Sequence, residues 1–534
     1  MKPQTDTPIP FRISLISMPW SIFNRPSLQL SVLKAYLERE MTAIQVELCH
    51  PYLELAGTLG FDTYRRISES GWAGEALFAA LLFPSQRQQA AKVFNQSLRG
   101  KGLRRTTPDF QTLIPLIEAS CHSWLDRINF EDVRLAGFSV CFNQLFSSLY
   151  AAALLKKRHP ELPIILGGSS CASELGISLL QHFPQIDYVV DGEGEGPLLG
   201  LCTSLAGDHS PLPARLHSRI PGLTRPSPEI TDLSLLPMPE YSGYFSEMRR
   251  LFPSQPFIPV LPLEFSRGCW WNKCTFCNLN IQWQGYRSKK ATQVMAEVDS
   301  LVATHQCLDF TFSDNALPIR EADTFFQQQS EHAADCRFFA EIRGITDFER
   351  LSAYSRGGLK TIQVGIEALS TSLLAKMAKG LSTIENIAVM KHSAAAGILL
   401  EGNLILEFPG SDENEVMETL AALDYVLPFA PLSPAVFFLG FGSPVYRNPA
   451  RFGIGTFIPH SRNRFLPTEL LTNLTMLTLD YRGGRRQQRR LWRPVADKIR
   501  SWRQFHDKRK SGQPPLSYRD GGSFLIIRQE RLND

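Results

Sequence analysis

The chain has 534 residues and a formal net charge of +4, with 43% hydrophobic and 20% charged residues. This composition is typical of a globular protein and excludes a disordered or fibrous chain. The length predicts two or three domains, because single hydrophobic cores do not grow this large. The small net charge gives no overall electrostatic reason to expect nucleic acid as a partner.

Targeting signals are missing from the sequence. No apolar run is long enough to cross a bilayer. The first 20 residues carry prolines and an acid where a signal peptide needs an uninterrupted apolar stretch. We therefore expect a cytoplasmic protein with no membrane partner.

The first 205 residues alternate between strand and helix patterns. Apolar runs predict strands at 11–18, 44–49, 133–140, 163–166 and 187–190. Helical periodicity follows at 27–37, 145–157 and 173–183, and a longer helical insertion occupies about 50–130. This alternation, with short glycine-rich joints, predicts an α/β fold with a Rossmann-like parallel sheet over 1–205.

The next two segments differ in pattern. Residues 206–258 are rich in proline and show little periodicity, so we expect a linker. Over 259–460, six strand-like segments alternate with helical stretches: 261–267, 308–314, 337–343, 361–367, 400–408 and 435–440. Six such units predict a partial (β/α)6 barrel.

The last segment, 461–534, is predicted to be a small, mostly helical accessory region that is strongly basic. Between Arg482 and Lys510 there are twelve Lys or Arg residues and two Asp. Such a helix can bind an acidic peptide or simply form a solvated face. Nucleic acid is a weaker alternative, based on Trp492, Trp502 and Phe505 between the basic residues. An Asp-Gly-Gly turn predicts a terminal hairpin.

Ten cysteines are present, and seven of them are expected to be small core residues: Cys49, Cys121, Cys141, Cys171, Cys202, Cys307 and Cys336. The other three, Cys269, Cys274 and Cys277, lie within nine residues. Three thiolates in a short loop can bind a [4Fe–4S] cluster and leave one iron open. A zinc loop or chance clustering are the alternatives, but zinc prefers four protein ligands and no fourth follows nearby. The loop follows the first barrel strand, where barrel enzymes place their chemistry.

The cysteine loop resembles the signature of the radical S-adenosylmethionine (SAM) superfamily, with Phe276 as the aromatic residue before the last cysteine. One departure is that four residues, rather than three, separate the first two cysteines. Further motifs follow in the order found in cobalamin-dependent maturases of ribosomally made peptides: Tyr286-Arg287-Ser288-Lys289, Phe312-Ser313-Asp314-Asn315, Glu341-Ile342-Arg343, Gly365-Ile366-Glu367, Lys379-Gly380, Phe408-Pro409-Gly410, Ser443-Pro444 and Phe452-Gly453.

This resemblance implies three cofactors: a [4Fe–4S] cluster on the three cysteines, SAM, and cobalamin as methylcobalamin. It implies that SAM is contacted by Phe276, Asn315, Glu341, Arg343 and Glu367. Arg343 suits the SAM carboxylate because a guanidinium can form a bidentate pair. Glu341 could take the amine or ribose hydroxyls, and ordinary ion pairs at strand ends are the alternative.

The N-terminal residues resemble a cobalamin-binding domain, in five segments: Met18-Pro19-Trp20, Pro26 to Leu30, Gly137-Phe138-Ser139, Gly167-Gly168-Ser169 and Gly192 to Glu195. The implied cofactor contacts are Ser139, Gly167, Gly168, Ser169, Gly192 and Glu193. The loop after Val140 holds no histidine, so we expect no histidine ligand to cobalt. Asn143 or Gln144 is expected to line that face.

The resemblance further implies a reaction. A 5′-deoxyadenosyl radical would abstract hydrogen from an unactivated carbon, which then takes a methyl group from methylcobalamin. The implied partners are a precursor peptide and an external electron donor of the flavodoxin or ferredoxin type. The alternatives are methylation or rearrangement of a small-molecule metabolite, and a non-catalytic corrinoid sensor.

Overall fold

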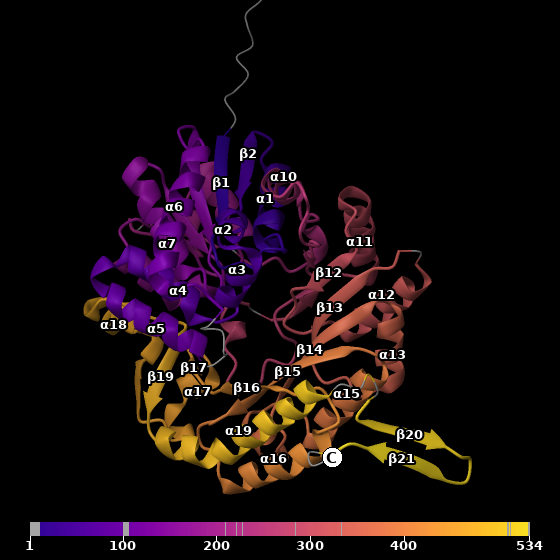
Figure 1. Cartoon of the computed structure of the whole chain (residues 1–534). Helices are drawn as coiled ribbons and strands as arrows, with labels where there is room; N and C mark the ends of the chain where they lie inside the picture. The colour runs from indigo at the N-terminus through magenta and orange to yellow at the C-terminus, as the bar shows by residue number, and fades with distance from the viewer. Residues whose placement is uncertain are drawn as a thin grey trace, which may run out of the picture.

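The computed structural model describes residues 11–99, 106–208, 210–220, 222–226, 228–283, 285–332, 334–509, 512 and 514–531. Two sheets of six strands and a C-terminal region make up the molecule (Figure 1). Within the described part of the chain, no helix combines the length and apolarity needed to cross a membrane. Half of the segment used for the signal-peptide prediction, residues 1–10, lies outside the described residues.

The first sheet has the strand order β2-β1-β3-β4-β5-β7. Its strands are β1 (Phe11–Ser17), β2 (Ile44–Cys49), β3 (Val133–Ser139), β4 (Ile164–Gly167), β5 (Tyr188–Val190) and β7 (Leu216–Ser218). The first five are parallel, as predicted, and β7 adds to the edge antiparallel to β5. In this doubly wound order the chain reverses direction between β1 and β3, where such sheets bind ligands at the carboxyl ends of the strands.

Helices cover both faces of this sheet: α1 (Leu28–Glu40), α7 (Leu145–Arg158), α8 (Glu174–His182) and α9 (Glu195–Leu205). The predicted insertion holds α2 (Pro51–Leu59), α3 (Phe61–Ser68), α4 (Trp72–Leu82), α5 (Arg87–Arg99) and α6 (Phe110–Arg127). The insertion also caps α7, because the buried Glu75 carboxylate accepts from the Leu145 and Phe146 amides at 3.1 and 3.0 Å. Burial raises the pKa of Glu75 to about 7, and the two amide bonds oppose that rise.

Residues 206–258 are more than the linker that their prolines predicted. They contain β6 (Leu212–Pro213), β7, β8 (Thr224–Arg225) and α10 (Ser242–Leu251). The helix α10 is joined to the first sheet by a His50 Nδ1–Glu247 Oε2 contact of 3.2 Å. Strands of two or three residues are too short to produce a periodic pattern, which is why the sequence did not predict them.

The second sheet has the order β16-β15-β14-β13-β12-β9, with every neighbouring pair parallel. Its strands are β9 (Leu261–Leu263), β12 (Asp309–Phe312), β13 (Arg337–Ile342), β14 (Leu359–Glu367), β15 (Leu399–Leu406) and β16 (Ser433–Val436). The helices between them are α11 (Ala291–His305), α12 (Ile319–Glu331), α13 (Phe348–Arg356), α14 (Thr371–Lys376), α15 (Thr383–Ala395) and α16 (Glu413–Val426). This is the six-stranded parallel arrangement that the sequence predicted.

Buried and accessible residues alternate along β13, β14 and β15, so this sheet has a buried outer face and an accessible inner face. Ile342, Val364 and Leu404 are buried, whereas Glu341, Gln363 and Glu401 are in register on adjacent strands and are half-buried or exposed. The inner face of the partial barrel is therefore polar.

The C-terminal region begins at β17 (Leu439–Gly440), ahead of the predicted boundary at residue 461, and it is less helical than predicted. It contains α17 (Pro444–Arg447), α18 (Thr468–Asn473) and α19 (Arg485–Lys508), and a three-stranded antiparallel sheet of β17, β18 (Thr456–Pro459) and β19 (Thr478–Arg482). The predicted terminal hairpin is confirmed as β20 (Leu516–Asp520) and β21 (Leu525–Gln529), with Gly521 and Gly522 in the turn.

The C-terminal region also touches the first domain, beneath α4 and α5 in Figure 1. Arg464 Nη2 donates to Gln96 Oε1 at 2.8 Å. The rings of Trp72 and His460 stack with centroids 4.9 Å apart. Two ends of the chain more than 350 residues apart are thus in contact.

Of the seven cysteines predicted to be core residues, six are buried and Cys141 is half-buried. Trp492 and Trp502, on one face of α19, are also buried, at 2% exposure each. The two tryptophans of α19 are therefore core residues, whereas Phe505 is half-buried, so two of the three rings named for the nucleic-acid alternative cannot stack on bases.

Candidate functional site

A cavity of about 320 Å³ lies between the two parallel sheets, at the carboxyl ends of their strands. The first domain contributes all six of its predicted cofactor contacts: Ser139, Gly167, Gly168, Ser169, Gly192 and Glu193. The second domain contributes Glu264, Arg267, Gly268, Gln282, Trp283 and Asn315. This volume lies at the lower end of the range of small-molecule sites.

The first domain gives the cavity an apolar region, walled by Leu15, Leu33, Ile165, Val190 and Leu198, beside the polar Ser139, Ser169, Glu193 and Glu195. Such a slot suits a flat aromatic base and offers it few polar groups. The residues present therefore fit the nucleotide tail of a corrinoid.

Small residues let the backbone approach this cavity closely. Gly168 has a φ of +105°, and a Cβ there would lie 2.7 Å from the Val140 carbonyl oxygen. A side chain at this position is excluded both by conformation and by space. Gly168 is thus required where it stands.

The loop after β3 does not use the residues that we expected. Gln144 is buried and its Nε2 donates to the Met18 carbonyl at 2.6 Å, while Asn143 Nδ2 donates to the Ser68 carbonyl at 3.1 Å. Both amides tie the first domain together and neither lines the cavity, so that prediction was wrong. Cys141 is the residue of this loop that does line it.

Gly168→Val is expected to lower corrinoid binding by at least about tenfold, because the new side chain displaces the 140–141 backbone at the cavity wall. Binding is measured as bound hydroxocobalamin absorbance after gel filtration. Gly207→Val is the control, since Gly207 has a φ of +109° with nothing within 4 Å of a Cβ. Equal losses in both variants would show that backbone strain alone is responsible.

The three cysteines lie in the loop that joins β10 (Ser266–Arg267) to β11 (Arg287–Ser288), an antiparallel pair. All three are partly accessible. Gly268 begins the loop with a φ of +85°, and a Cβ there would lie 2.1 Å from the Gly285 carbonyl oxygen. The loop is therefore closed at its base by a contact that only glycine permits.

The cysteine loop rests on the turn that follows α14. The Thr275 amide donates to the Met377 carbonyl at 2.9 Å, and Trp271 Nε1 donates to the Ala378 carbonyl at 2.9 Å. Gly380 has a φ of +67°, and a Cβ there would lie 2.2 Å from the Trp271 ring. The turn at 377–380, which we call the support turn, therefore holds the cysteine loop in place.

Burial raises the pKa of Cys274 and raises that of Cys277 to about 11, whereas the positive charge of Lys379 opposes both shifts. Thiols of this kind become thiolates when a metal displaces the proton. In the described part of the chain, no three His, Cys, Asp or Glu side chains are grouped closely enough for one metal ion. Three cysteines on one supported loop have the donor chemistry for three corners of an iron–sulfur cube.

The residues predicted to bind SAM surround this loop. The Arg343 guanidinium lies 3.8 Å from the centre of the Trp271 ring and donates to the Lys379 carbonyl. Glu367 Oε1 is 3.3 Å from Lys379 Nζ. Burial, and then the charge of Glu367, raise the pKa of Glu341 to about 7.

The two other predicted contacts differ from each other. Asn315 lines the cavity, whereas Phe276 packs against the hydrophobic core. The structure thus places Asn315 between the cavity and the second sheet, and it gives Phe276 a packing role.

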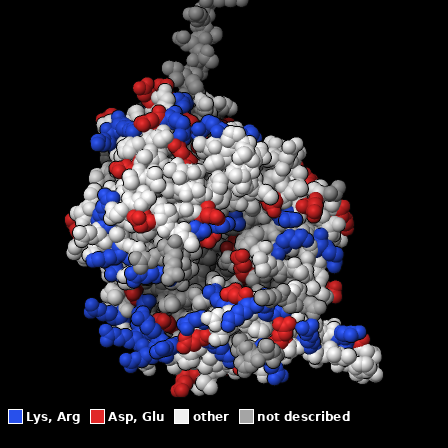
Figure 2. All heavy atoms as spheres, viewed as in Figure 1, with Lys and Arg blue, Asp and Glu red and all other residues white. Residues whose placement is uncertain are grey.

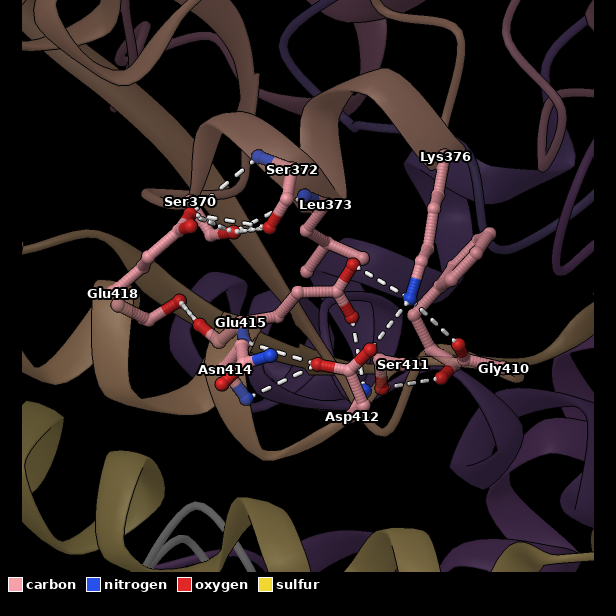
Figure 3. Close-up of polar contacts among 12 residues, drawn as sticks. Ser370, Ser372, Leu373, Lys376, Gly410, Ser411, Asp412, Asn414, Glu415 and Glu418 are labelled. Atoms are coloured by element: carbon pink, nitrogen blue, oxygen red, sulfur yellow. Dashed lines mark hydrogen bonds and ion pairs between the residues drawn. The ribbon is translucent and has the colours of Figure 1, made fainter.

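The support turn is itself anchored by Lys376, the last residue of α14 (Figure 3). Figure 3 shows its Nζ pointing toward Gly410, Asp412 and Glu415, with Nζ–O distances of 3.0, 3.1 and 2.8 Å. The Glu415 side chain is 1% exposed, so its carboxylate needs this cation. Lys376 therefore joins the support of the cysteine loop to the start of α16.

Lys376→Met should loosen the cysteine loop without removing a cysteine. We expect a chelator to extract iron from the variant several-fold faster than from the wild type, because the support turn loses its anchor. The measurement is the decay of the cluster absorbance in EDTA. Lys360→Met is the control, because Lys360 is exposed and its Nζ donates to the Ser355 carbonyl, away from the cysteine loop; equal decay rates would contradict the prediction.

An ion-pair network that the sequence did not predict joins the two domains at the cavity wall. Arg267 Nη1 and Nη2 lie 3.0 and 2.6 Å from Glu193 and Glu195, and its Nε lies 2.7 Å from Glu264. Arg287, its partner across the β10–β11 pair, lies 2.8 Å from Glu193. We call these five residues the interdomain clamp. The Arg267, Glu193 and Glu195 side chains are at most 6% exposed.

The clamp connects the Gly192–Glu195 turn directly to the cysteine loop, because Arg267 is two residues before Cys269. Burial opposes the charge of the Arg267 guanidinium, but Glu264 and Glu195 outweigh it and raise its pKa. Glu193, predicted to contact the cofactor, lines the cavity while its carboxylate is bound to the two arginines.

Comparison with known proteins agrees with this arrangement. Residues 263–423 match the family model described as the radical SAM superfamily. The uncharacterized methyltransferase PH0819 of Pyrococcus horikoshii is 24% identical over 301 residues, which cover 54% of this chain and 63% of that relative. The matched region thus spans less than two thirds of that relative's length.

Two solved structures share the fold across 92% of this chain. The cobalamin-dependent SAM radical enzyme OxsB, with aqua-cobalamin and SAM bound, has a TM-score of 0.62 at 14% identity and is covered over 67% of its length. The radical SAM methyltransferase TsrM from Kitasatospora setae, with tryptophan substrate and a SAM analogue bound, has a TM-score of 0.60 at 16% identity and 88% coverage. Residues 263–423 therefore match a radical SAM domain, and 92% of the chain shares the fold of OxsB and TsrM.

Proposed function

We propose that this protein is a cobalamin-dependent radical SAM methyltransferase that methylates an unactivated carbon of a ribosomally made precursor peptide. One observation carries the proposal. A single cavity joins the small residues at the carboxyl edge of the first sheet to β10, the strand of the second domain that leads into the cysteine loop. A corrinoid in that cavity would lie beside a cluster on the cysteine loop.

The cysteine loop is the proposed cluster site. Cys269, Cys274 and Cys277 would hold the [4Fe–4S] cluster, and the support turn at 377–380 would keep the three sulfurs in place. Lys379 and Arg343 add positive charge that favours thiolates.

SAM would be held by the residues around that loop. Arg343 would exchange its contact with the Lys379 carbonyl for the SAM carboxylate, which it can bind with two parallel hydrogen bonds. Glu341 is half-buried on the inner face of β13 and has an accessible carboxyl for the amine or ribose hydroxyls. Glu367 and Asn315 complete the proposed contacts from β14 and from the loop after β12.

The first domain is the proposed corrinoid site. The nucleotide tail would enter between Leu15, Leu33, Ile165 and Leu198, and the backbone at 167–169 would approach the corrin edge. No histidine lines this cavity among the described residues. When bound, the cluster and the corrinoid would supply SAM cleavage and the methyl group, with electrons from a flavodoxin- or ferredoxin-type donor.

The experiment is anaerobic reconstitution with iron, sulfide and hydroxocobalamin, followed by SAM and dithionite. We expect about four irons and one corrinoid per chain, and formation of 5′-deoxyadenosine. Coexpression with the short peptide encoded beside the gene should add the mass of one methylene unit to that peptide. A chain that binds no corrinoid, or an unchanged peptide mass with a methylated small metabolite, would overturn the proposal.

A further inference from the structure

The first half of α19 carries arginines that the described chain leaves without a countercharge. Arg486, Arg490 and Arg493 are exposed and form no ion pair with any described residue. Arg489, also exposed, reaches only Glu407, at 3.9 Å. These four side chains, which we call the arginine face, lie on one side of the helix because they are spaced by three, four and seven residues.

The second half of the same helix is different. Lys498 Nζ is 2.6 Å from Asp424, and Arg500 Nη2 is 3.1 Å from Asp497. In the first half, Arg485 pairs with Asp480 and Arg489 lies 3.9 Å from Glu407, whereas Arg486, Arg490 and Arg493 have no ion pair with a described residue. Unpaired positive charge in the first half of α19 is therefore confined to one side of the helix.

Further arginines extend the positive surface beyond the helix. Arg482, at the end of β19, and Arg464 are exposed. Burial, and then the charges of Arg485 and Arg462, lower the pKa of His460 to about 4. Figure 2 shows Lys and Arg side chains gathered at the lower left, where Figure 1 places the start of α19 and β19.

The arginine face lies next to the proposed active site. Glu407, the partner of Arg489, directly follows β15 of the second sheet. On the opposite side of the helix, Gln488 Nε2 and Trp492 Nε1 bond to the Ser411 carbonyl and hydroxyl at 2.7 and 2.8 Å. Ser411 lies between Gly410 and Asp412, the partners of Lys376 in Figure 3. The width of α19 thus separates the arginine face from the anchor of the cysteine-loop support.

We propose that the arginine face binds an acidic polypeptide segment and thereby brings the attached substrate to the mouth of the second sheet. This inference rests on the proposed function, because it identifies the segment as the acidic part of the precursor peptide. Glutamates spaced like the arginines would pair with them. A polypeptide fits better than a nucleic acid, because Trp492 and Trp502 are buried and give this face no ring on which bases can stack.

The test uses the full-length protein and a fluorescein-labelled peptide of ten glutamates, with fluorescence anisotropy at low salt. The variant combines Arg486→Glu, Arg490→Glu and Arg493→Glu. The control makes the same change in charge at exposed positions outside α19: Lys157→Glu, Lys391→Glu and Arg519→Glu. We expect Kd to rise by at least about tenfold in the variant and by less than about threefold in the control, because local pairing outweighs total charge.

Two results would overturn the proposal. One is an equal loss of affinity in both triple variants, which would indicate attraction to overall charge only. The other is tighter binding of a ten-nucleotide oligodeoxythymidine that only the first variant loses, which would assign the face to nucleic acid. A matched Arg→Gln triple variant repeats the comparison if charge reversal prevents folding.

The same samples separate this inference from the proposed function. Iron content, corrinoid content and 5′-deoxyadenosine formation without peptide should be equal in wild type and variant, because the arginine face contacts none of the cofactor residues. If the wild type binds the glutamate peptide but forms no 5′-deoxyadenosine, the proposed function is wrong, whereas peptide binding by the arginine face is still supported.

Discussion

The Cys274→Ala variant is expected to hold less than one iron per chain and to cleave SAM at less than about one hundredth of the wild-type rate. Cys274 is the middle ligand of the cysteine loop, and the next residue, Thr275, fixes the loop to the Met377 carbonyl. Two remaining thiols cannot hold a cube with one open iron, so the loss should be nearly complete. Iron is measured by chelation assay and 5′-deoxyadenosine by chromatography.

Cys336→Ala is the matched control, because Cys336 is buried in the second domain and lies outside the loop. It should keep its iron and its rate, at a modest cost in stability. Full iron content in Cys274→Ala, or one zinc ion in the wild type, would remove the cluster and with it the proposed radical chemistry.

Arg267→Met is expected to destabilise the folded chain by about 3–5 kcal/mol, because it leaves the buried Glu195 carboxylate without its cation and leaves Glu193 with Arg287 alone. Glu193 and Glu195 are each 5% exposed at this contact, so water cannot replace the guanidinium. Since the clamp forms part of the cavity wall, bound corrinoid should be lost as well. Unfolding followed by tryptophan fluorescence in urea, and corrinoid absorbance after gel filtration, measure the two effects.

Arg12→Met provides the comparison, since the Arg12–Glu47 pair is 25% and 42% exposed and should contribute less than about 1 kcal/mol. Adding Glu193→Gln and Glu195→Gln to Arg267→Met should restore part of the stability, because neutral amides are easier to bury than unpaired carboxylates. The role of the clamp would be refuted if Arg267→Met and Arg12→Met unfolded at the same urea concentration.

Patterns of sequence predicted the sheets well because their signal is local. Most strands of the two six-stranded sheets are apolar runs of four to nine residues, and the order of strands and helices along the chain leaves few parallel arrangements. The short strand β7 and the antiparallel β17–β19 sheet were not predicted, because two to five residues carry no period and their partners are distant in the sequence.

The parts of the candidate site that the sequence predicted are those where an uncommon residue type occurs in a recognisable spacing. The cysteine triplet and the glycines at 167 and 168 are of this kind. The clamp was missed because Arg267 and Glu195 are ordinary residues whose pairing, across 72 positions, depends on how the domains pack. Two arginines in register on the β10–β11 pair, with a Gly-Glu-Gly-Glu turn upstream, were the available signal.

The sequence also could not predict which side chains of α19 face the core and which face solvent. The count of basic residues predicted a charged helix, but pairing with Asp424 and burial of Trp492 depend on which side meets α16. The Asn143 and Gln144 prediction failed for a similar reason, because loop amides find backbone partners in the first domain once it folds.

The contact between the C-terminal region and α5 has a consequence for the way substrates enter. Arg464 meets Gln96, and His460 meets Trp72, so the polypeptide forms a closed circuit: first domain, second domain, C-terminal region and back again. In a closed circuit the two halves of the cavity cannot swing apart about one hinge. The contact also buries rings, since Phe465 is 0% exposed and its ring centroid lies 5.1 Å from that of Phe146, so opening the cavity on this side would have to separate hydrophobic as well as polar contacts.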